Sequence, residues 1–373
     1  MYEPQPVYLI FPTNAIGGAE KRMLELWVEF KKIGRSNYYC LMHDDLLVAI
    51  ENNSLLGRAI NPFSRDILTY SFPISQATIS FQRQLRAHIL KHIPGNAVLH
   101  FVLLYPAFAG SLKGYDTVFS LTESSLRNVN WKGKLLYWLS AIRSKKVDVL
   151  DPGVFQKMQN RLFWRRKTIY GTPGSFVDTT LFVPAAQKKD QVVFLGRFFF
   201  LKQIKKLVLM WPEVMKLVKD QGIASANIEL LLLGYGQEED AIRAILKEES
   251  YQRIAIKIEM THQPEIYLAH SKLIFSLQLN NNYPSKSLLE ALSAGNIPVV
   301  TDVGDTRKIA DPSFSYYVPE NFLAQDIANA IVAIWRLDTA TLKIKQELAR
   351  THVKMNFSVQ ASVNYYQDLY DKN

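Results

Sequence analysis

Short apolar runs of strand type alternate with amphipathic helical segments through both halves of this 373-residue chain. In the second half the expected strands, each followed by a helical stretch, are residues 191–195, 228–233, 254–258, 273–277 and 297–301. The first half repeats the pattern, with expected strands at residues 7–12, 39–43, 97–104 and 117–121. Strands connected by helices are typical of parallel sheets, so we predict an α/β chain with two doubly wound sheets.

The segment GTPGSFVDTTLFVP at residues 171–184 is rich in turn formers and has no regular period. We place the domain junction there. The expected domains are residues 1–172 and 173–356, and a final segment, 357–373, holds a helix at residues 359–370.

Composition indicates a globular chain with 48% hydrophobic residues, long enough for two cores. Cys40 is the single cysteine, which excludes an internal disulfide and favours a reducing, cytoplasmic setting. The first residues lack a basic segment of the secretory type. The longest apolar stretch, 97–112, is broken by His100 and Pro106 and is too short to span a bilayer.

The positive charge is unevenly spread. Residues 1–185 hold 22 Lys+Arg and 13 Asp+Glu, whereas residues 186–373 hold 22 and 21. The first half is therefore expected to face something anionic, and a nucleic acid, a phospholipid surface and a pyrophosphate-linked substrate all qualify. Residues 131–142 mix Trp131 and leucines with lysines, so this segment either lies on a membrane surface or packs as an ordinary core helix.

Two glycine turns follow expected strands. Gly17-Gly18 opens a helix after the first strand, which would let phosphate or sugar oxygens approach backbone N–H groups. Gly234 and Gly236 close a four-leucine strand and would allow a base or ribose to approach. A plain tight turn is the alternative in both places.

Arg197 and Lys202 follow the strand at 191–195 and stand five residues apart. The C-terminal ends of parallel strands border the crevice where nucleotides bind, and two cations there suit a diphosphate. The alternative is a pair of solvated surface charges.

The stretch NNNYPSKSLLEALSAGNIPVV at residues 280–300 combines a polar loop, a short helix and a strand. Pro284 suits a first helical position, and Gly295 fits a C-terminal cap. Glu290 interrupts the leucine stripe of this helix. It lies either on a solvated face or close to a ligand's hydroxyl groups.

A polar patch, Thr122-Glu123-Ser124-Ser125, follows the strand at 117–121, at a sheet edge that places ligands in open α/β folds. His100 lies inside or at the end of a buried strand and is either structural or in contact with a ligand. The chain has no D-x-D motif and no His/Cys cluster with metal-ligand spacing, so we expect no metal and no cofactor.

Taken together, these motifs resemble the retaining GT-B glycosyltransferases of the family-4 type, also called glycosyl transferases group 1. The resemblance runs through most of the chain and rests on GGAE at 17–20, TPGSFVDTTLFVP at 172–184, Arg197 with Lys202, GYG at 234–236 and LLEALSAGNIPVV around Glu290. It implies two Rossmann-like domains facing a cleft, with a last helix that crosses back to the first domain.

The resemblance also implies roles for individual residues. Arg197, Lys202, Gly17 and Gly18 would contact the donor diphosphate, while Glu290 would bind the ribose near Gly234 and Gly236. The residues expected at the donor sugar are Asn282, Tyr283, Pro284, Ser285 and His100.

Two positions depart from the family pattern. Asn282 stands where a glutamate is common, so it brings no negative charge to the reacting carbon, and a mechanism in which the leaving diphosphate assists is favoured. Glu123 lies where many relatives carry a histidine, and it is a candidate to touch the donor sugar or the acceptor. With Glu290, these two residues are the catalytic candidates.

The resulting prediction is a retaining, metal-independent hexosyltransferase that uses a nucleotide-sugar donor. Its acceptor would be a glycan or a lipid-linked hydroxyl in cell-surface polysaccharide or glycoconjugate synthesis. The basic first domain would meet an anionic membrane surface at the inner face of the cytoplasmic membrane, and nucleic acid ranks last as a partner. The alternatives are a nucleotide-sugar epimerase of the same fold and a catalytically inactive, glycosyltransferase-like partner subunit.

Overall fold

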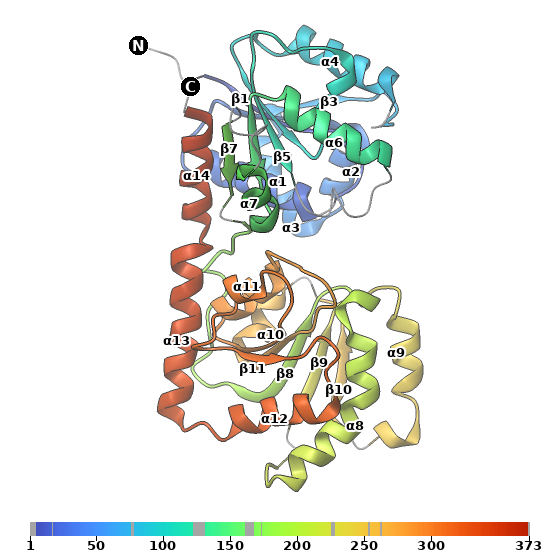
Figure 1. Ribbon diagram of the computed structural model, residues 1–373, viewed down its shortest axis with the longest axis vertical. Coiled ribbons are helices and arrows are strands. Elements are labelled where there is room, and N and C mark those ends of the chain that lie inside the picture. Colours follow the sequence, from blue (N-terminus) through green and yellow to red (C-terminus); the bar gives the residue numbers. More distant parts are fainter. Residues whose placement is uncertain are drawn as a thin grey trace. The chain divides into compact units, whose positions relative to one another are not determined.

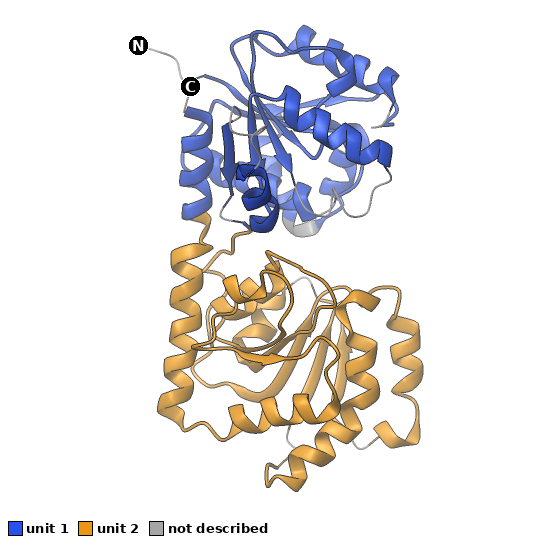
Figure 2. Ribbon diagram, in the orientation of Figure 1, with its two compact units in different colours: residues 1–174, 360–373 blue, residues 175–359 orange. Residues whose placement is uncertain are grey.

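A computed structural model of the chain describes residues 5–16, 18–75, 78–121, 131–160, 168–172, 174–224, 228–252, 254–261 and 263–371. The chain forms two compact units (Figures 1 and 2). Unit 1 comprises residues 1–174 and 360–373, and unit 2 comprises residues 175–359. No helix in the described ranges is long and apolar enough to cross a bilayer.

Unit 1 is built on a parallel seven-stranded sheet with the order β3-β2-β1-β4-β5-β6-β7. Its strands are β1 (Val7–Phe11), β2 (Tyr38–His43), β3 (Ile67–Tyr70), β4 (Val98–Val102), β5 (Asp116–Leu121), β6 (Lys146–Val149) and β7 (Thr168–Gly171). Its helices are α1 (Gly18–Lys32), α2 (Asp44–Glu51), α3 (Ser54–Ile60), α4 (Ile79–His92), α6 (Trp131–Arg143), α7 (Pro152–Gln159) and α14 (Val359–Asp371). Short 3₁₀ turns are η1 (Asn61–Asp66) and η2 (Ala107–Ala109).

Unit 2 carries a parallel six-stranded sheet with the order β10-β9-β8-β11-β12-β13. Its strands are β8 (Lys189–Leu195), β9 (Glu229–Leu233), β10 (Ile256–Glu259), β11 (Ser271–Ser276), β12 (Ile297–Thr301) and β13 (Tyr316–Val318). Its helices are α8 (Ile204–Asp220), α9 (Glu239–Ile245), α10 (Pro264–His270), α11 (Lys286–Ser293), α12 (Ala324–Trp335) and α13 (Thr339–Asn356). The 3₁₀ turns are η4 (Phe200–Lys202), η6 (Glu249–Tyr251) and η7 (Thr306–Lys308).

Both sheets follow the Rossmann order, in which the chain moves outward to one side of the first strand and then crosses to the other side. The two-sheet α/β prediction is confirmed. The strand order reverses between β1 and β4 in unit 1 and between β8 and β11 in unit 2. Such a reversal opens a crevice at the C-terminal ends of the two central strands, where α/β proteins bind ligands.

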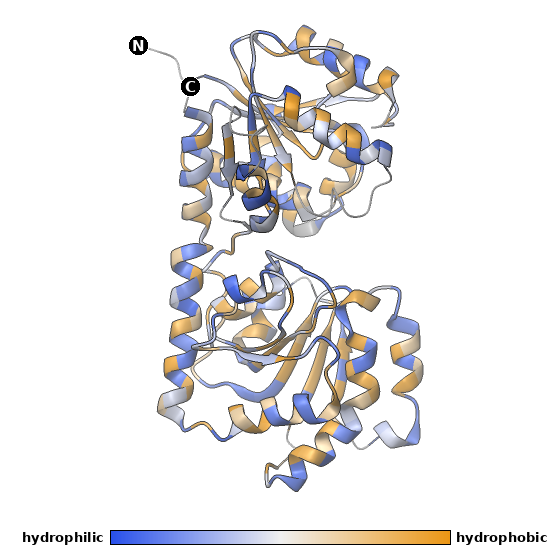
Figure 3. Cartoon of the chain, viewed as in Figure 1, coloured by the Kyte–Doolittle hydropathy of each residue, from blue (hydrophilic) through white to orange (hydrophobic). Residues whose placement is uncertain are grey.

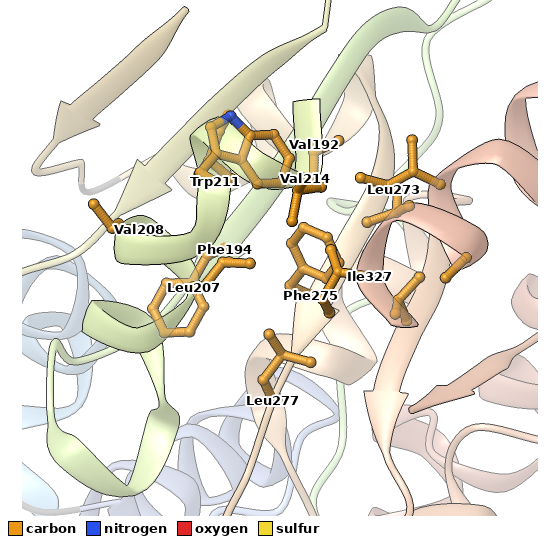
Figure 4. Packing of buried hydrophobic residues seen from close by; sticks show 14 of the residues in the cluster. Val192, Phe194, Leu207, Val208, Trp211, Val214, Leu273, Phe275, Leu277 and Ile327 are labelled. Atoms are coloured by element: carbon orange, nitrogen blue, oxygen red, sulfur yellow. The ribbon is translucent and has the colours of Figure 1, made fainter. Parts of the chain in front are cut away.

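The strands of unit 2 are predominantly hydrophobic (Figure 3) because both faces of its sheet are covered. On one face Trp211 of α8 packs edge-on against Phe275 of β11, with ring centroids 6.1 Å apart (Figure 4). On the other face the buried leucines Leu288, Leu289 and Leu292 of α11 join a second core cluster. The apolar stripe expected at residues 288–292 therefore anchors α11 to the sheet.

Helix α14 belongs to unit 1 from Gln360 onward, and a buried polar network attaches it there. Asp148 of β6 is fully buried and accepts hydrogen bonds from the hydroxyls of Tyr365 (2.7 Å) and Tyr366 (2.9 Å). Arg22 of α1 donates to the Tyr366 hydroxyl at 3.0 Å. These bonds compensate the cost of burying the carboxylate and fix the last helix on the first sheet.

Candidate active site

The strand-reversal edge of unit 2 gathers the residues that the sequence singles out. Arg197 and Lys202 follow β8, and the loop with Asn282 follows β11. The backbone N–H of Leu279 donates to the carbonyl of Leu201 at 3.0 Å, which joins the two loops directly. The sheet order and this bond place both loops at one edge.

Arg197 is exposed and Lys202 is half-buried. Burial and the nearby charge of Arg197 lower the pKa of Lys202 to about 8. In the part of the chain that the structure describes, neither side chain forms an ion pair or a hydrogen bond. Two like charges held together without a carboxylate make an anion-binding position.

Helix N-termini add to the positive potential of this edge. Helix α8 begins at Ile204, two residues after Lys202, and α11 begins at Lys286 after the β11 loop. No side-chain hydrogen bond caps the first turn of either helix within the described residues. Their N–H groups therefore remain available to an anionic ligand.

Glu290 is half-buried in the middle of α11. It lies four residues, or about 6 Å along the axis, from the first residue of the helix. Lys286 stands one turn earlier on the same helix face. The residues on either side of Glu290, Leu289 and Ala291, are fully buried, so its orientation follows from the packing of α11.

The end of α11 matches the prediction and its start does not. Gly295 has φ +71°, and it donates to Leu292 at 3.0 Å while Asn296 donates to Ala291 at 2.9 Å, the two bonds of a Schellman cap. The expectation that Pro284 opens the helix is wrong. Ser285 is the extended N-cap, the first helical residue is Lys286, and the Tyr283–Pro284 peptide bond is cis.

The loop of Asn282 is held by Asn281, whose role the sequence analysis missed. The Asn281 Oδ1 atom accepts hydrogen bonds from the backbone N–H groups of Tyr283 and Asp305, both at 3.2 Å. A Cβ atom on Gly304, which has φ +55°, would lie 2.5 Å from Cβ of Asn281. Asn281 thus joins the β11 loop to the β12 loop, and only its neighbour in this third loop reveals the role.

Gly234 and Gly236 have a packing reason to be glycine. A Cβ atom on Gly234 would lie 1.9 Å from the carbonyl oxygen of Gly196, and one on Gly236 would lie 2.6 Å from that of Phe198. The Phe198 N–H also donates to the Tyr235 carbonyl at 2.8 Å. The loop after β9 therefore supports the loop of Arg197, and the side chain of Tyr235 is exposed beside it.

His100 is a correction to the predicted donor-sugar contacts. It is fully buried in unit 1, where Nε2 lies 2.7 Å from Ser120 Oγ and Nδ1 lies 2.7 Å from the Tyr370 hydroxyl. The Ser120 hydroxyl donates to Asp148 at 2.8 Å, so His100 Nε2 donates to Ser120 and Nδ1 accepts from Tyr370. Both nitrogens are occupied in docking α14, which leaves none for a sugar.

The remaining calls concern unit 1. Gly18 is the first residue of α1, and a Cβ atom there would meet nothing within 4 Å, so internal packing does not require glycine. Gly17 and Glu123 lie outside the described residues. Across the described ranges, no three His, Cys, Asp or Glu side chains converge as a metal-binding group.

Comparison with known proteins gives the class of fold. Residues 180–349 match the family model described as Glycosyl transferases group 1, so unit 2 carries this domain. The matched range includes Arg197, Lys202, Asn282 and Glu290. No curated protein matches the sequence.

Solved structures share the fold along nearly the whole chain. A glycosyltransferase from Rickettsia africae is 17% identical with a TM-score of 0.74, and the match covers 99% of this chain and 98% of that chain. HepE from Anabaena, in complex with UDP and glucose, is 12% identical with a TM-score of 0.72, covering 99% and 100%. The pneumococcal O-GlcNAc transferase GtfA, in complex with UDP and GlcNAc, is 12% identical with a TM-score of 0.71, covering 98% of each chain. The two Rossmann-like sheets are those of the GT-B fold.

Proposed function

We propose that this chain is a retaining glycosyltransferase that needs no metal and moves a hexose from a nucleoside diphosphate to a hydroxyl group. The acceptor is a glycan or a lipid-linked saccharide in cell-surface polysaccharide or glycoconjugate synthesis, and the protein works on the cytoplasmic side. The observation that carries the proposal is the pair Arg197 and Lys202 at the strand-reversal edge. The group 1 domain match and the UDP complexes of HepE and GtfA support the choice of donor.

In this proposal the two cations bind the donor diphosphate. When the bond between the sugar's anomeric carbon and the diphosphate breaks, negative charge grows on the leaving oxygen. Arg197, Lys202 and the first N–H groups of α8 and α11 stabilise that charge. Because they are already in place in the free protein, they need no rearrangement during the reaction.

The other residues of this edge orient the donor. Glu290 accepts hydrogen bonds from the ribose hydroxyls, and the exposed ring of Tyr235 offers a stacking face near Gly234 and Gly236. Asn282, with Tyr283 to Ser285, contacts sugar hydroxyls through its amide and the neighbouring backbone. Asn281 keeps this loop in register with the β12 loop.

The chemical step conserves charge and protons. The acceptor oxygen bonds to the anomeric carbon on the face that the diphosphate leaves, and its proton passes to the departing phosphate oxygen. This route suits Asn282, which carries no negative charge and cannot act as a nucleophile. Glu123 and Gly17-Gly18 remain proposed contacts on the acceptor and phosphate side.

A ligand panel followed by product analysis tests the proposal. Thermal shift with UDP-, GDP-, ADP- and dTDP-sugars should identify a stabilising donor, since a ligand at about 100 times its Kd adds roughly 2.7 kcal/mol to the free energy of unfolding. Incubation of that donor with saccharide acceptors should release the nucleoside diphosphate and give a product with the donor's anomeric configuration.

Other results would decide against the proposal. Conversion of the nucleotide sugar without acceptor and without release of diphosphate would identify an epimerase. Binding without any turnover would identify an inactive partner subunit. Failure of every nucleotide sugar to stabilise the protein would remove the donor site altogether.

A further inference from the structure

Helix α6 exposes an apolar stripe to solvent. Trp131, Leu135 and Ile142 lie at positions i, i+4 and i+11 and are 70%, 47% and 38% exposed. The opposite side of the helix buries Leu136, Ser140 and Ala141 against the first sheet. Of the two fates that the sequence left open for this segment, the helix packs through its smaller residues and leaves large apolar side chains outside.

Two neighbouring elements extend this surface. Phe108 of η2 and the outward residues Ile79 and Leu90 of α4 are also exposed. We call the surface made by Ile79, Leu90, Phe108, Trp131, Leu135 and Ile142 the α4–α6 face.

Hydrogen bonds hold the three elements together. The Phe108 N–H donates to Gln82 of α4 at 2.7 Å, and Arg143 of α6 donates to the Ala107 carbonyl at 2.5 Å. Side chains of α4 and α6 enter the same core cluster, so both helices cover one face of the sheet. The α4–α6 face is therefore preformed.

The charge around this face has one sign. Helices α4 and α6 together contain six Lys and Arg residues and no Asp or Glu: Arg83, Arg86, Lys91, Lys132, Lys134 and Arg143. Lys132 and Lys134 flank the stripe of α6 and are exposed. The surrounding unit is basic as well, since residues 1–174 hold 22 Lys+Arg and 12 Asp+Glu.

We propose that the α4–α6 face docks on an anionic phospholipid bilayer, with α6 lying in the plane of the interface. Tryptophan, leucine and isoleucine on one side of a short helix, with lysines beside them, fit the boundary between headgroups and acyl chains. Basic residues without interspersed acids fit a surface of uniform negative charge better than a protein partner, whose surface carries both signs. Docking would bring unit 1 to lipid-linked acceptors, but it can be measured without any donor and so stands apart from the transferase proposal.

Vesicle co-sedimentation of the full chain tests the inference. The probes are vesicles of phosphatidylcholine alone and vesicles with 30% phosphatidylglycerol. Each Lys or Arg near an anionic surface adds about fivefold to partitioning. We expect the wild-type protein to bind the anionic vesicles at least tenfold more tightly, and 0.5 M salt should remove most of this difference.

Matched variants separate the apolar and the charged contributions. Trp131→Ser/Leu135→Ser should weaken binding at least tenfold, whereas Ile344→Ser/Leu348→Ser, an exposed pair with the same spacing on α13, should bind like wild type. Lys132→Glu/Lys134→Glu should weaken binding to anionic vesicles at least about 25-fold. Lys216→Glu/Lys219→Glu on α8 is the control for charge.

Fluorescence keeps the test independent of multiple substitutions. Brominated lipids should quench tryptophan emission of the wild-type protein, and Trp131→Phe should lose most of this quenching while keeping the circular dichroism of the wild type. The proposal is overturned if the wild-type protein stays off anionic vesicles, if the α13 pair matters as much as the α6 pair, or if Trp131→Phe is quenched like wild type. Self-association or protein binding through α6 without vesicle binding would equally overturn it.

Discussion

Lys202 shares its half-buried position after β8 with the guanidinium of Arg197, and burial together with that charge lowers the pKa of Lys202 to about 8. An anion bound between the two side chains would remove the repulsion and raise the pKa of Lys202. The pair is thus under electrostatic stress that a diphosphate relieves. Donor binding should for this reason be linked to a proton.

The first prediction is a pH dependence of donor affinity. Below pH 8 Lys202 is already charged, so affinity should be flat. Above pH 8 the free protein loses this proton while the complex keeps it, and affinity should fall by up to about tenfold per pH unit. Calorimetric titration with a nucleotide sugar in buffers of different ionisation enthalpy measures both the affinity and the proton uptake.

Lys202→Arg supplies the control for this titration. Arginine keeps its charge throughout the range, so the variant should bind with nearly constant affinity from pH 7 to pH 9.5. A decline above pH 8 that persists in Lys202→Arg would assign the proton to another group.

The second prediction concerns Glu290. Glu290→Gln should lose a charge-assisted hydrogen bond worth about 1.5–3 kcal/mol, which lowers affinity for the nucleoside diphosphate at least about tenfold. The loss should vanish for a 2′,3′-dideoxynucleoside diphosphate, which has no ribose hydroxyls to bind. Glu213→Gln, an exposed acid on α8, is the control. Equal losses with both ligands would place Glu290 away from the ribose.

The third prediction concerns the contact of Gly304 with Asn281. Gly304→Ala should destabilise unit 2 by about 1–3 kcal/mol, because the new methyl group meets the Asn281 side chain and a residue other than glycine is strained at φ +55°. In Gly304→Ala/Asn281→Ala the space is restored, so the double variant should be less destabilised than the sum of the single variants. Urea unfolding measures all three. Additive losses would show that the two positions are not in contact.

The fourth prediction uses the buried His100. Burial lowers its pKa to about 4 from the ordinary 6.5, so the unfolded chain binds the extra proton between these values. Stability should therefore fall as the pH drops from 6.5 to 4, by about 3 kcal/mol in total. His100→Gln should unfold with a weaker pH dependence in this window. An unchanged slope in the variant would assign the acid sensitivity to other groups.

The strongly patterned parts of the fold were predictable from sequence. The β12 strand was placed at its observed bounds, and Gly295 correctly marked the end of α11. In these segments the apolar run or the cap is local, so a short window contains the physical cause. The same holds for the cations after β8, whose position follows from the end of a recognisable strand.

Other elements depend on contacts with distant parts of the chain. Strand β6, with Lys146 and Asp148, does not read as a buried strand because the partners that satisfy these charges come from β5 and α14. His100 looked available for a ligand for the same reason. The short strand β13 and the helices α12 and α13 were not predicted either, and the rule that proline opens helices misplaced the start of α11.

The candidate site shows the same division. Arg197, Lys202 and Glu290 were named from sequence because charged residues stand out beside apolar strands and helices. Asn281 was missed because its function as a link depends on the backbone of Tyr283 and Asp305. The two asparagines beside it in the sequence look identical, and only the loop after β12 distinguishes them.

Calorimetric titration of wild type and Arg197→Ala/Lys202→Ala at pH 7 with the best-bound nucleoside diphosphate and with its nucleoside tests the central claim most directly. Two lost charge-assisted contacts should lower affinity for the diphosphate at least about 100-fold and leave affinity for the nucleoside within about twofold. Lys216→Ala/Lys219→Ala should match wild type with both ligands. If the double variant at Arg197 and Lys202 binds the diphosphate as tightly as wild type, these cations do not hold the donor and the proposed site is wrong.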